Sequence, residues 1–179
     1  GPVIFLSNCQ DSSILDRLRV SGVTIKQISE PHPDASDLRL TIKTIRDVSG
    51  NLPHNMMPWV LLDGYNFDET YHHSIMNTGA KLIVVDDMAH LSRYEANVIV
   101  NQNSYAKESN YQVNEDATLL LGEDYALLRR EFFTWDVTPR EIPRDARRLL
   151  VTLGGSDPVN FTPVVIGSLD LIEEMKFEV

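Results

Sequence analysis

The chain has 179 residues, of which 42% are hydrophobic, and this size fits one ordinary domain or one domain plus part of another. Its formal net charge of −10, from 26 acidic and 16 basic residues, comes without a basic patch, so nucleic acid is not an expected partner. The aliphatic runs are too short to span a membrane, and the single cysteine, Cys9, excludes an intrachain disulfide and suits a reducing cytoplasm.

Short aliphatic runs alternate with helical patterns in the first part of the chain. Strands are predicted at three of these runs, residues 3–6, 23–28 and 59–62. Helices are predicted between and after them, over residues 14–20, 34–48 and 68–77. Two neighbouring histidines, His72 and His73, fall on the third helix, where they face different ways and are expected to be solvated.

The central stretch, residues 81–103, contains two aliphatic runs that both end in polar side chains. Residues 82–85 are followed by Asp86 and Asp87, and residues 98–100 by three amides, residues 101–103. Buried parallel strands are continuous aliphatic runs, because helices cover both faces of their sheet. Ligands in such sheets bind beyond the carboxyl ends of the strands. The sequence therefore predicts an α/β fold, a doubly wound parallel (Rossmann-like) sheet with a ligand-binding edge.

The last part of the chain is predicted to begin a second α/β unit. A strand at residues 119–121 is followed, further on, by residues 138–148, which hold two prolines and four arginines and resemble a linker. A strand at 149–153 and a helix from Thr162 to Met175 come next. The expected domains are therefore residues 1–137 and 149–179, joined by the linker.

Several polar clusters are candidates for ligand binding, and each has a plainer explanation. Asp63 stands at a strand end before Gly64, Tyr65 and Asn66, but it could instead cap the next helix. Asp86 and Asp87 point to opposite faces of a strand, so one can face a ligand while the other braces a loop.

Two further clusters also have a plainer explanation. With His90, Asp86 and Asp87 form a weak metal-binding pattern that no second cluster supports, so no metal is expected. Residues 154–156, Gly-Gly-Ser between a strand and a helix, suit a phosphate loop or an ordinary tight turn equally well.

Five segments in one order resemble a known family: DGYNF, VVDD, NQNSYAKESNY, LLGEDYALLRREF and VTLGGSDPVN. They are similar to the UDP-sugar hydrolases of the pseudaminic-acid pathway and the spore-coat polysaccharide biosynthesis proteins, relatives of MurG-type glycosyltransferases with the two-domain GT-B fold. The resemblance implies hydrolysis of a UDP-diacetamido-trideoxyhexose to free sugar and UDP, without a metal or another cofactor.

The resemblance also implies roles for particular residues. The sugar would lie against Asp63, Tyr65, Asn101 and Asn103, with Asn66 and Asp87 in the same strand-end clusters. The loop Gly154, Gly155, Ser156 and Asp157 would lie close to the diphosphate, and Tyr125 and Arg129 would belong to the crossover between the domains.

The family begins with a strand, a glycine-rich loop and a histidine thought to be the catalytic base, and this sequence has no match to them. We therefore expect no catalytic residue in the chain, no activity of the chain alone, and self-association through an exposed sheet edge. Two alternatives stay open: a GT-B glycosyltransferase with a UDP-sugar donor, and a non-catalytic sugar-binding or assembly domain.

Overall fold

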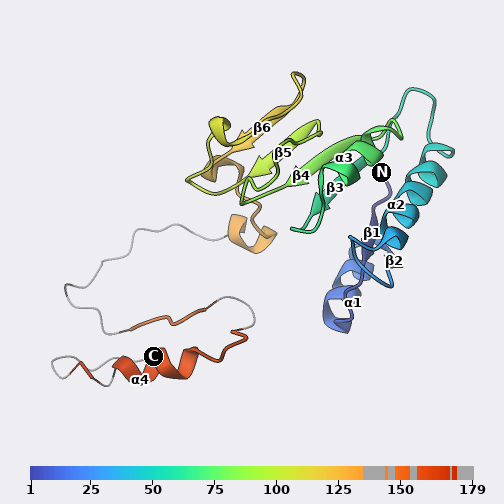
Figure 1. The fold of residues 1–179 in the computed structure, drawn as a ribbon. Helices are drawn as coiled ribbons and strands as arrows, with labels where there is room; N and C mark the ends of the chain where they lie inside the picture. Colours follow the sequence, from blue (N-terminus) through green and yellow to red (C-terminus); the bar gives the residue numbers. More distant parts are fainter. Residues whose placement is uncertain (135–143, 145–147, 154–156, 170, 173–179) are drawn as a thin grey trace. The chain divides into compact units, whose positions relative to one another are not determined.

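The computed structural model describes residues 1–134, 144, 148–153, 157–169 and 171–172 (Figure 1). The chain divides into two compact units, Gly1–Arg129 and Arg130–Val179. Among the described residues, the second unit forms one 3₁₀-helix, η3 (Arg130–Thr134), and one α-helix, α4 (Thr162–Leu169). All strands formed by the described residues belong to the first unit.

Strands and helices alternate in the first half of this unit, as the sequence predicts. They are, in chain order, β1 (Ile4–Ser7), α1 (Ser12–Val20), β2 (Thr24–Gln27), α2 (Ala35–Ser49), β3 (Trp59–Asp63), α3 (Glu69–Met76) and β4 (Lys81–Val85). No α-helix follows β4 within the unit; the remaining elements are β5 (Val98–Asn101), η1 (Glu108–Asn110), β6 (Thr118–Leu121) and η2 (Glu123–Tyr125).

All strand pairs formed by the described residues are parallel. One sheet has the order β3-β4-β5-β6, and β1 pairs with β2 in a second, two-stranded sheet. Parallel strands need long crossover connections. α1 lies in the crossover from β1 to β2 and α3 in that from β3 to β4, while α2 lies in the connection between the two sheets. The fold is mixed α/β with parallel sheets, which is consistent with a Rossmann-like doubly wound arrangement. This confirms the predicted fold class.

The helices begin at aspartates. Asp11, Asp34 and Asp68 are the N-cap residues of α1, α2 and α3, and the Asp68 carboxylate accepts a hydrogen bond of 2.8 Å from the backbone N–H of Tyr71. Such caps satisfy N–H groups that have no partner in the first helical turn. Asp68, and not Asp63, therefore caps α3, which leaves Asp63 for another role.

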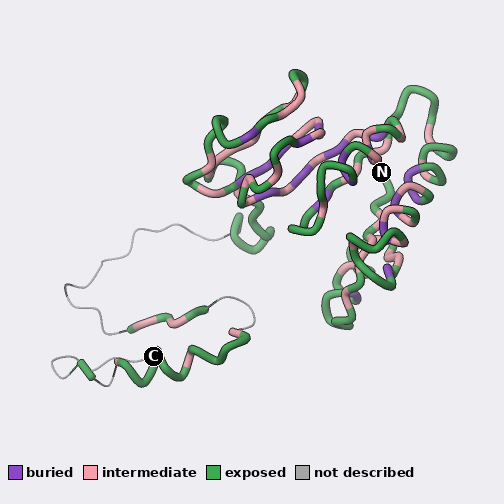
Figure 2. The backbone as a smooth tube through the Cα atoms, viewed as in Figure 1, coloured by how far each residue is buried: buried purple, intermediate pink, exposed green. Residues whose placement is uncertain are grey.

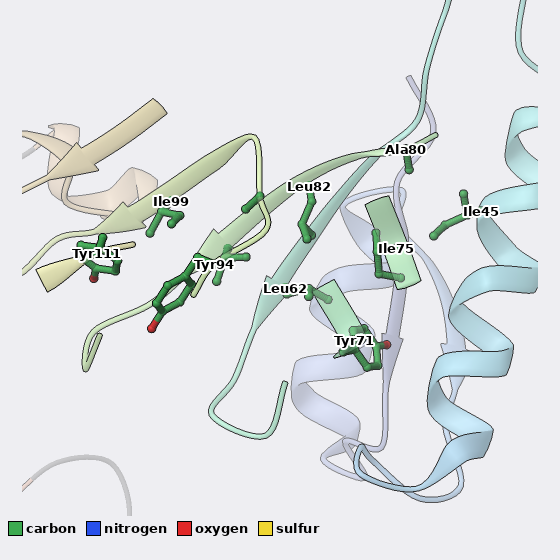
Figure 3. Close-up of a cluster of buried hydrophobic side chains, with 11 residues drawn as sticks. Ile45, Leu62, Tyr71, Ile75, Ala80, Leu82, Tyr94, Ile99 and Tyr111 are labelled. Carbon is green, nitrogen blue, oxygen red and sulfur yellow. The ribbon is translucent and has the colours of Figure 1, made fainter. Parts of the chain in front are cut away.

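The hydrophobic core lies between β3, β4 and β5 and the helices α2 and α3 (Figure 3). Figure 2 shows the buried backbone concentrated in the central strands. Side chains that point alternately into this core explain the burial pattern of β4, in which every second residue is buried. The most buried members are Tyr71, Ile75, Leu82, Tyr94, Ala96 and Ile99.

His72 belongs to the interior, so the expectation that it is solvated is wrong. It is 1% exposed, its ring centroid lies 5.9 Å from that of Tyr94, and burial lowers its pKa. His73, in contrast, is exposed and its Nδ1 lies 2.8 Å from the Glu95 carboxylate. The two histidines do face different ways, and α3 is covered on the side that carries His72.

The second unit differs from its predicted elements. Residues 149–153 have no regular secondary structure, and no strand among the described residues pairs with them. An aliphatic run forms a strand only where it finds a partner. The helix that begins at Thr162 ends at Leu169, while residues 170 and 173–179 lie outside the described residues, as does the linker 138–148 apart from 144 and 148.

The packing predicts unequal effects of two leucine substitutions on neighbouring strands. Leu82 is 0% exposed and Leu61 is 58% exposed. Leu82→Ala leaves a cavity, so the free energy of unfolding falls by about 2–5 kcal/mol. Leu61→Ala, the matched control, changes it by less than about 1 kcal/mol. Urea denaturation followed by circular dichroism measures both, and equal losses would contradict the packing.

Candidate functional site

The carboxyl ends of β3, β4 and β5 lie side by side. Asp63 is the last residue of β3, Asp87 follows β4, and Asn101 is the last residue of β5. The parallel register pairs Asp63 with Val85, and Val85 with Val100. The structure therefore brings Asp63, Asp87 and Asn101 to one edge of one sheet, where parallel α/β sheets bind their ligands.

A cavity of about 170 Å³ lies at the carboxyl ends of β1 and β3. Its polar lining includes Ser7 and Asn8 at the end of β1, His32 from the loop before α2, and Asp63 and Asn66 around the end of β3. These side chains offer an acid, an amide, a hydroxyl and an imidazole within one small space. Such convergent polar groups are typical of a ligand pocket.

Gly64 shapes the turn that separates Asp63 from Asn66. Its φ of +150° is a backbone conformation that residues with side chains rarely adopt, and an added Cβ would lie 3.3 Å from the Phe67 ring. A larger residue would therefore strain the turn and press on Phe67.

His32 is one of the pocket residues that were not predicted from the sequence. Its side chain is 12% exposed, and its ring packs edge-on against Tyr71 with 4.8 Å between the centroids. Its Nδ1 is buried without a hydrogen-bond partner among the described residues, and its Nε2 lies 3.7 Å from the Asp68 carboxylate. No motif surrounds His32 in the sequence, so only the fold reveals its place in the pocket.

The Asp37 carboxylate, on α2, anchors the loop that carries His32. It is 3% exposed, and it accepts one hydrogen bond of 2.9 Å from the backbone N–H of His32 and another of 2.7 Å from the Tyr71 hydroxyl. Burial raises the pKa of Tyr71, so the phenol stays protonated and keeps donating. This carboxylate links α2, α3 and the pocket.

Tyr65, Asp87 and Tyr105 form a polar cluster at the exposed edge of the sheet. The Tyr65 hydroxyl donates to the Asp87 carboxylate (2.8 Å), and the Tyr105 hydroxyl donates to the Asp87 carbonyl oxygen (2.9 Å). The hydrogen bond to Asp87 raises the pKa of Tyr65. Both phenol rings are more than half exposed, so they present flat apolar faces beside a carboxylate.

Asp86 and Asp87 have different roles, as expected for adjacent residues. Asp86 is 8% exposed and accepts hydrogen bonds from the hydroxyls of Tyr94 (3.0 Å) and Tyr111 (2.6 Å) and from the backbone N–H of Ala89 (2.8 Å). Asp86 therefore braces the loops after β4 and β5, and Asp87 is the aspartate at the exposed cluster.

Asn101 is buried and bonded within its own chain. Its Nδ2 donates to the Tyr111 hydroxyl (2.8 Å), and its Oδ1 accepts from the Nδ2 of Asn103 (2.9 Å). At 1% exposure, Asn101 is a positioning residue for Asn103, which is only partly buried. Of these two predicted binding residues, Asn103 is the one that a ligand can reach.

Tyr125 and Arg129 lie in the segment after β6, whose carboxyl end is at the same edge of the sheet. The Gly122 N–H donates to the Asn101 carbonyl oxygen (2.8 Å), so the end of β6 lies beside the end of β5. Tyr125 is the last residue of η2, and Arg129 is the last residue of the first unit. The side chain of Gln102 fixes the segment between them by accepting from the Leu127 N–H (2.9 Å).

The predicted phosphate loop is described only at its last residue. Gly154, Gly155 and Ser156 lie outside the described residues. The Asp157 carboxylate accepts from the N–H groups of Phe161 (2.8 Å) and Thr162 (2.9 Å) and from the Thr162 hydroxyl (2.6 Å). The Asp157 carboxylate therefore satisfies N–H groups at the start of α4.

Two features are absent from the described residues. None of the helices there has the length and apolar character needed to cross a membrane. Within the same residues, no three His, Cys, Asp or Glu side chains gather as metal ligands would.

Comparison with known proteins gives two relatives. The chain is 27% identical over 173 residues to an uncharacterized protein of Methanocaldococcus jannaschii, covering 93% of this chain and 32% of that protein. It is 25% identical over 155 residues to the UDP-2,4-diacetamido-2,4,6-trideoxy-β-L-altropyranose hydrolase of Campylobacter jejuni, covering 85% of this chain and 53% of the hydrolase. The chain thus spans about a third of the Methanocaldococcus jannaschii protein and about half of the hydrolase. No family model matches the sequence.

The buried network around Asp86 predicts a large effect of losing one hydroxyl. Tyr111→Phe removes the donor to Asp86 and the acceptor for Asn101, so the free energy of unfolding falls by about 1–3 kcal/mol. Tyr105→Phe removes only a hydroxyl at an exposed side chain and changes it by about 0.5 kcal/mol or less. Urea denaturation of both variants measures the difference, and a Tyr111→Phe chain as stable as Tyr105→Phe would rule out the network.

The same network predicts a loss of stability in alkali. Burial raises the pKa of Tyr94 to about 12, whereas a tyrosine in the unfolded chain titrates near pH 10. Tyr94 therefore loses its proton first in the unfolded state. Its ionisation does not change the free energy of unfolding below about pH 9 and lowers it as the pH rises from about 10 to about 12.

Urea midpoints at pH 8, 9.5 and 11 measure this fall. Tyr94→Phe, which cannot ionise, is the control, and its midpoint should depend less steeply on pH. Identical pH profiles of the two proteins would contradict the role of Tyr94.

Proposed function

We propose that the chain is the sugar-binding part of a protein that hydrolyses a UDP-linked diacetamido-trideoxyhexose to the free sugar and UDP. The observation that carries this proposal is the shared carboxyl edge of β3, β4 and β5, with Asp63, the Tyr65–Asp87 cluster and Asn103 along it. The likeness to the Campylobacter jejuni hydrolase supports the choice of ligand.

The side chains at this edge match the chemistry of an acetamido sugar. The exposed Asp63 carboxylate makes no hydrogen bond to the described residues, so it is available to a sugar hydroxyl. The exposed Tyr65 ring suits the apolar face of a deoxy sugar. The Asn103 amide both donates and accepts, which is what an acetamido group requires.

The proposed reaction is attack of water at the anomeric carbon. The water oxygen bonds to that carbon, the bond from the carbon to the phosphate oxygen breaks, and its electron pair leaves with UDP. The water proton passes to a general base, which must lie within hydrogen-bond reach of the water. We assign binding and orientation to this chain, and the base to none of its residues, so we expect no turnover by the chain alone.

The remaining predicted residues complete the proposal. In a GT-B arrangement of residues 1–137 and 149–179, joined by 138–148, the diphosphate would face Gly154, Gly155, Ser156 and Asp157. Asn66 would lie with Asp63 at the sugar, and Tyr125 and Arg129 would serve the crossover. We prefer a hydrolase to a glycosyltransferase because the relative with a named activity is a hydrolase.

Titration with UDP-2,4-diacetamido-2,4,6-trideoxy-β-L-altropyranose, followed by amide NMR, tests this proposal. We expect saturable shifts at Gly64, Asn66 and Asn103. Asp63→Asn should raise the Kd about tenfold, or about 1.4 kcal/mol, because the amide accepts a weaker hydrogen bond than the carboxylate. The control, Asp116→Asn, changes an exposed aspartate just before β6, at the opposite end of that strand, and should leave the Kd unchanged.

Two outcomes would overturn the proposal. One is the absence of saturable shifts with the UDP-sugar. The other is a set of shifts confined to the amino ends of the strands, with equal effects of the two aspartate substitutions.

A further inference from the structure

Asp87 fixes the tips of two tyrosine rings that come from different loops. Tyr65 lies between β3 and α3, and Tyr105 lies between β5 and η1. The Tyr65 hydroxyl donates to Asp87 Oδ2 (2.8 Å), and the Tyr105 hydroxyl donates to the Asp87 carbonyl oxygen (2.9 Å). The segment that follows β4 therefore joins two loops at the carboxyl edge of the sheet.

Tyr105 is also held at its backbone. It lies in a tight turn that is closed by a hydrogen bond of 3.0 Å from the Ala106 N–H to the Asn103 carbonyl oxygen. Both the backbone N–H and the side-chain amide of Asn103 donate to the Asn101 side chain, which is buried. The Tyr105 ring is thus anchored through its turn at one end and through its hydroxyl at the other.

The two anchored rings are nevertheless exposed, Tyr65 by 63% and Tyr105 by 62%. A tyrosine offers a large flat surface, and little conformational entropy is lost when a ligand binds to a ring that is already ordered. One exposed apolar side chain is ordinary in any protein. Two fixed rings around one aspartate, at the edge where parallel sheets bind their ligands, indicate a binding surface.

The carboxylate of Asp87 is less open to a ligand than the rings are. Its Oδ2 accepts from Tyr65, and its Oδ1 is buried without a hydrogen-bond partner among the described residues. The hydrogen bond to Asp87, with smaller contributions from nearby Asp63 and Tyr105, raises the pKa of Tyr65. The phenol therefore stays protonated and continues to donate at neutral pH. A ligand at this place meets the two rings before it meets the Asp87 carboxylate.

We propose that Tyr105 is a sugar-contacting residue, whose ring forms with that of Tyr65 an aromatic surface for the apolar part of a deoxy amino sugar. Asp87 is the positioning residue that holds both rings. This inference rests on the proposed function and adds to it a contact residue that the sequence did not single out. A 2,4,6-trideoxy sugar has a methyl group and few hydroxyls, so much of its surface suits aromatic rings.

A purely structural role of Tyr105 makes a different prediction. If the side chain only tied its loop to Asp87, the hydroxyl would be the important group, because it makes the hydrogen bond. Tyr105→Phe would then be as harmful as Tyr105→Leu. If the face of the ring contacts the sugar, Tyr105→Phe keeps the contact and Tyr105→Leu loses it.

Titration of the full chain with UDP-2,4-diacetamido-2,4,6-trideoxy-β-L-altropyranose, followed by amide NMR, compares these variants. Tyr105→Leu should raise the Kd about tenfold, and Tyr105→Phe by less than about threefold. Trp59→Leu is the matched control, because Trp59 is a 58% exposed aromatic residue at the amino end of β3, the end opposite to the site. It should leave the Kd unchanged.

Two substitutions of Asp87 test its positioning role in the same titration. Asp87→Asn keeps an oxygen that can accept from the Tyr65 hydroxyl, so the Kd should rise by less than about threefold. Asp87→Ala releases the Tyr65 ring and should raise the Kd about tenfold. A direct contact between the Asp87 charge and the sugar would make the two substitutions equally harmful.

A measurement on the unmodified chain does not depend on any variant folding. With ¹³C-labelled tyrosine in the chain and the UDP-sugar bound, we expect nuclear Overhauser effects from the sugar protons to the ring protons of both Tyr65 and Tyr105.

The outcomes separate this inference from the proposed function. If the UDP-sugar binds with shifts at Gly64, Asn66 and Asn103, three results overturn the inference alone. They are the absence of Overhauser effects at Tyr105, equal Kd values of Tyr105→Leu and the unmodified chain, and equal losses from Asp87→Asn and Asp87→Ala. Absence of saturable binding to the unmodified chain overturns the proposed function, and this inference with it.

Discussion

The in-register parallel pairing of β3, β4, β5 and β6 is the constraint on which the rest of the first unit depends. Hydrogen bonds between neighbouring strands fix where each strand ends, and the polar residues that follow are thereby carried to a common edge. The alternation along β4 then sends Leu82 and Val84 into the core beneath that edge. A slip of one residue would reverse both arrangements at once.

In the second half of this sheet, buried hydrogen bonds and not α-helices hold the connections between strands in place. The connections after β4 and β5 contain no α-helix, yet they are fixed by the rings of Tyr94 and Tyr111, whose centroids lie 5.3 Å apart and whose hydroxyls both donate to Asp86. The backbone N–H of Tyr94 also donates to the Gln112 carbonyl oxygen (2.8 Å). Such a fully bonded buried network is rigid, so the exposed groups that it supports are held in place.

Elements with a local signal were predicted correctly. Aliphatic runs and helical patterns identified β1 to β6 and the positions of α2 and α3, because strand and helix periodicity act over a few residues. Residues whose role comes from distant partners were not identified. Tyr111 and Asp86 are 25 positions apart, and Tyr71 and Asp37 are 34 apart, so nothing near them in the sequence marks these contacts.

The same reasoning explains the remaining differences. The low exposure of the His32 and His72 side chains comes from tertiary packing, which the periodicity of the sequence does not predict. The run at residues 149–153 had the composition of a strand but has no pairing partner among the described residues. Asn101 was correctly placed at the edge, but its burial turns it into a support for Asn103. Sequence therefore predicted the framework better than the burial of the side chains within it.

The exposed apolar side chains at β1 and β3 have a practical consequence for handling the folded chain. Val3, Phe5, Trp59 and Leu61 give a native molecule the kind of exposed apolar surface that makes dyes such as ANS fluoresce. In other proteins, bright dye fluorescence is taken as a sign of a molten globule. With this chain, the dye would report an ordered surface, so bright fluorescence would not indicate a loss of fixed packing.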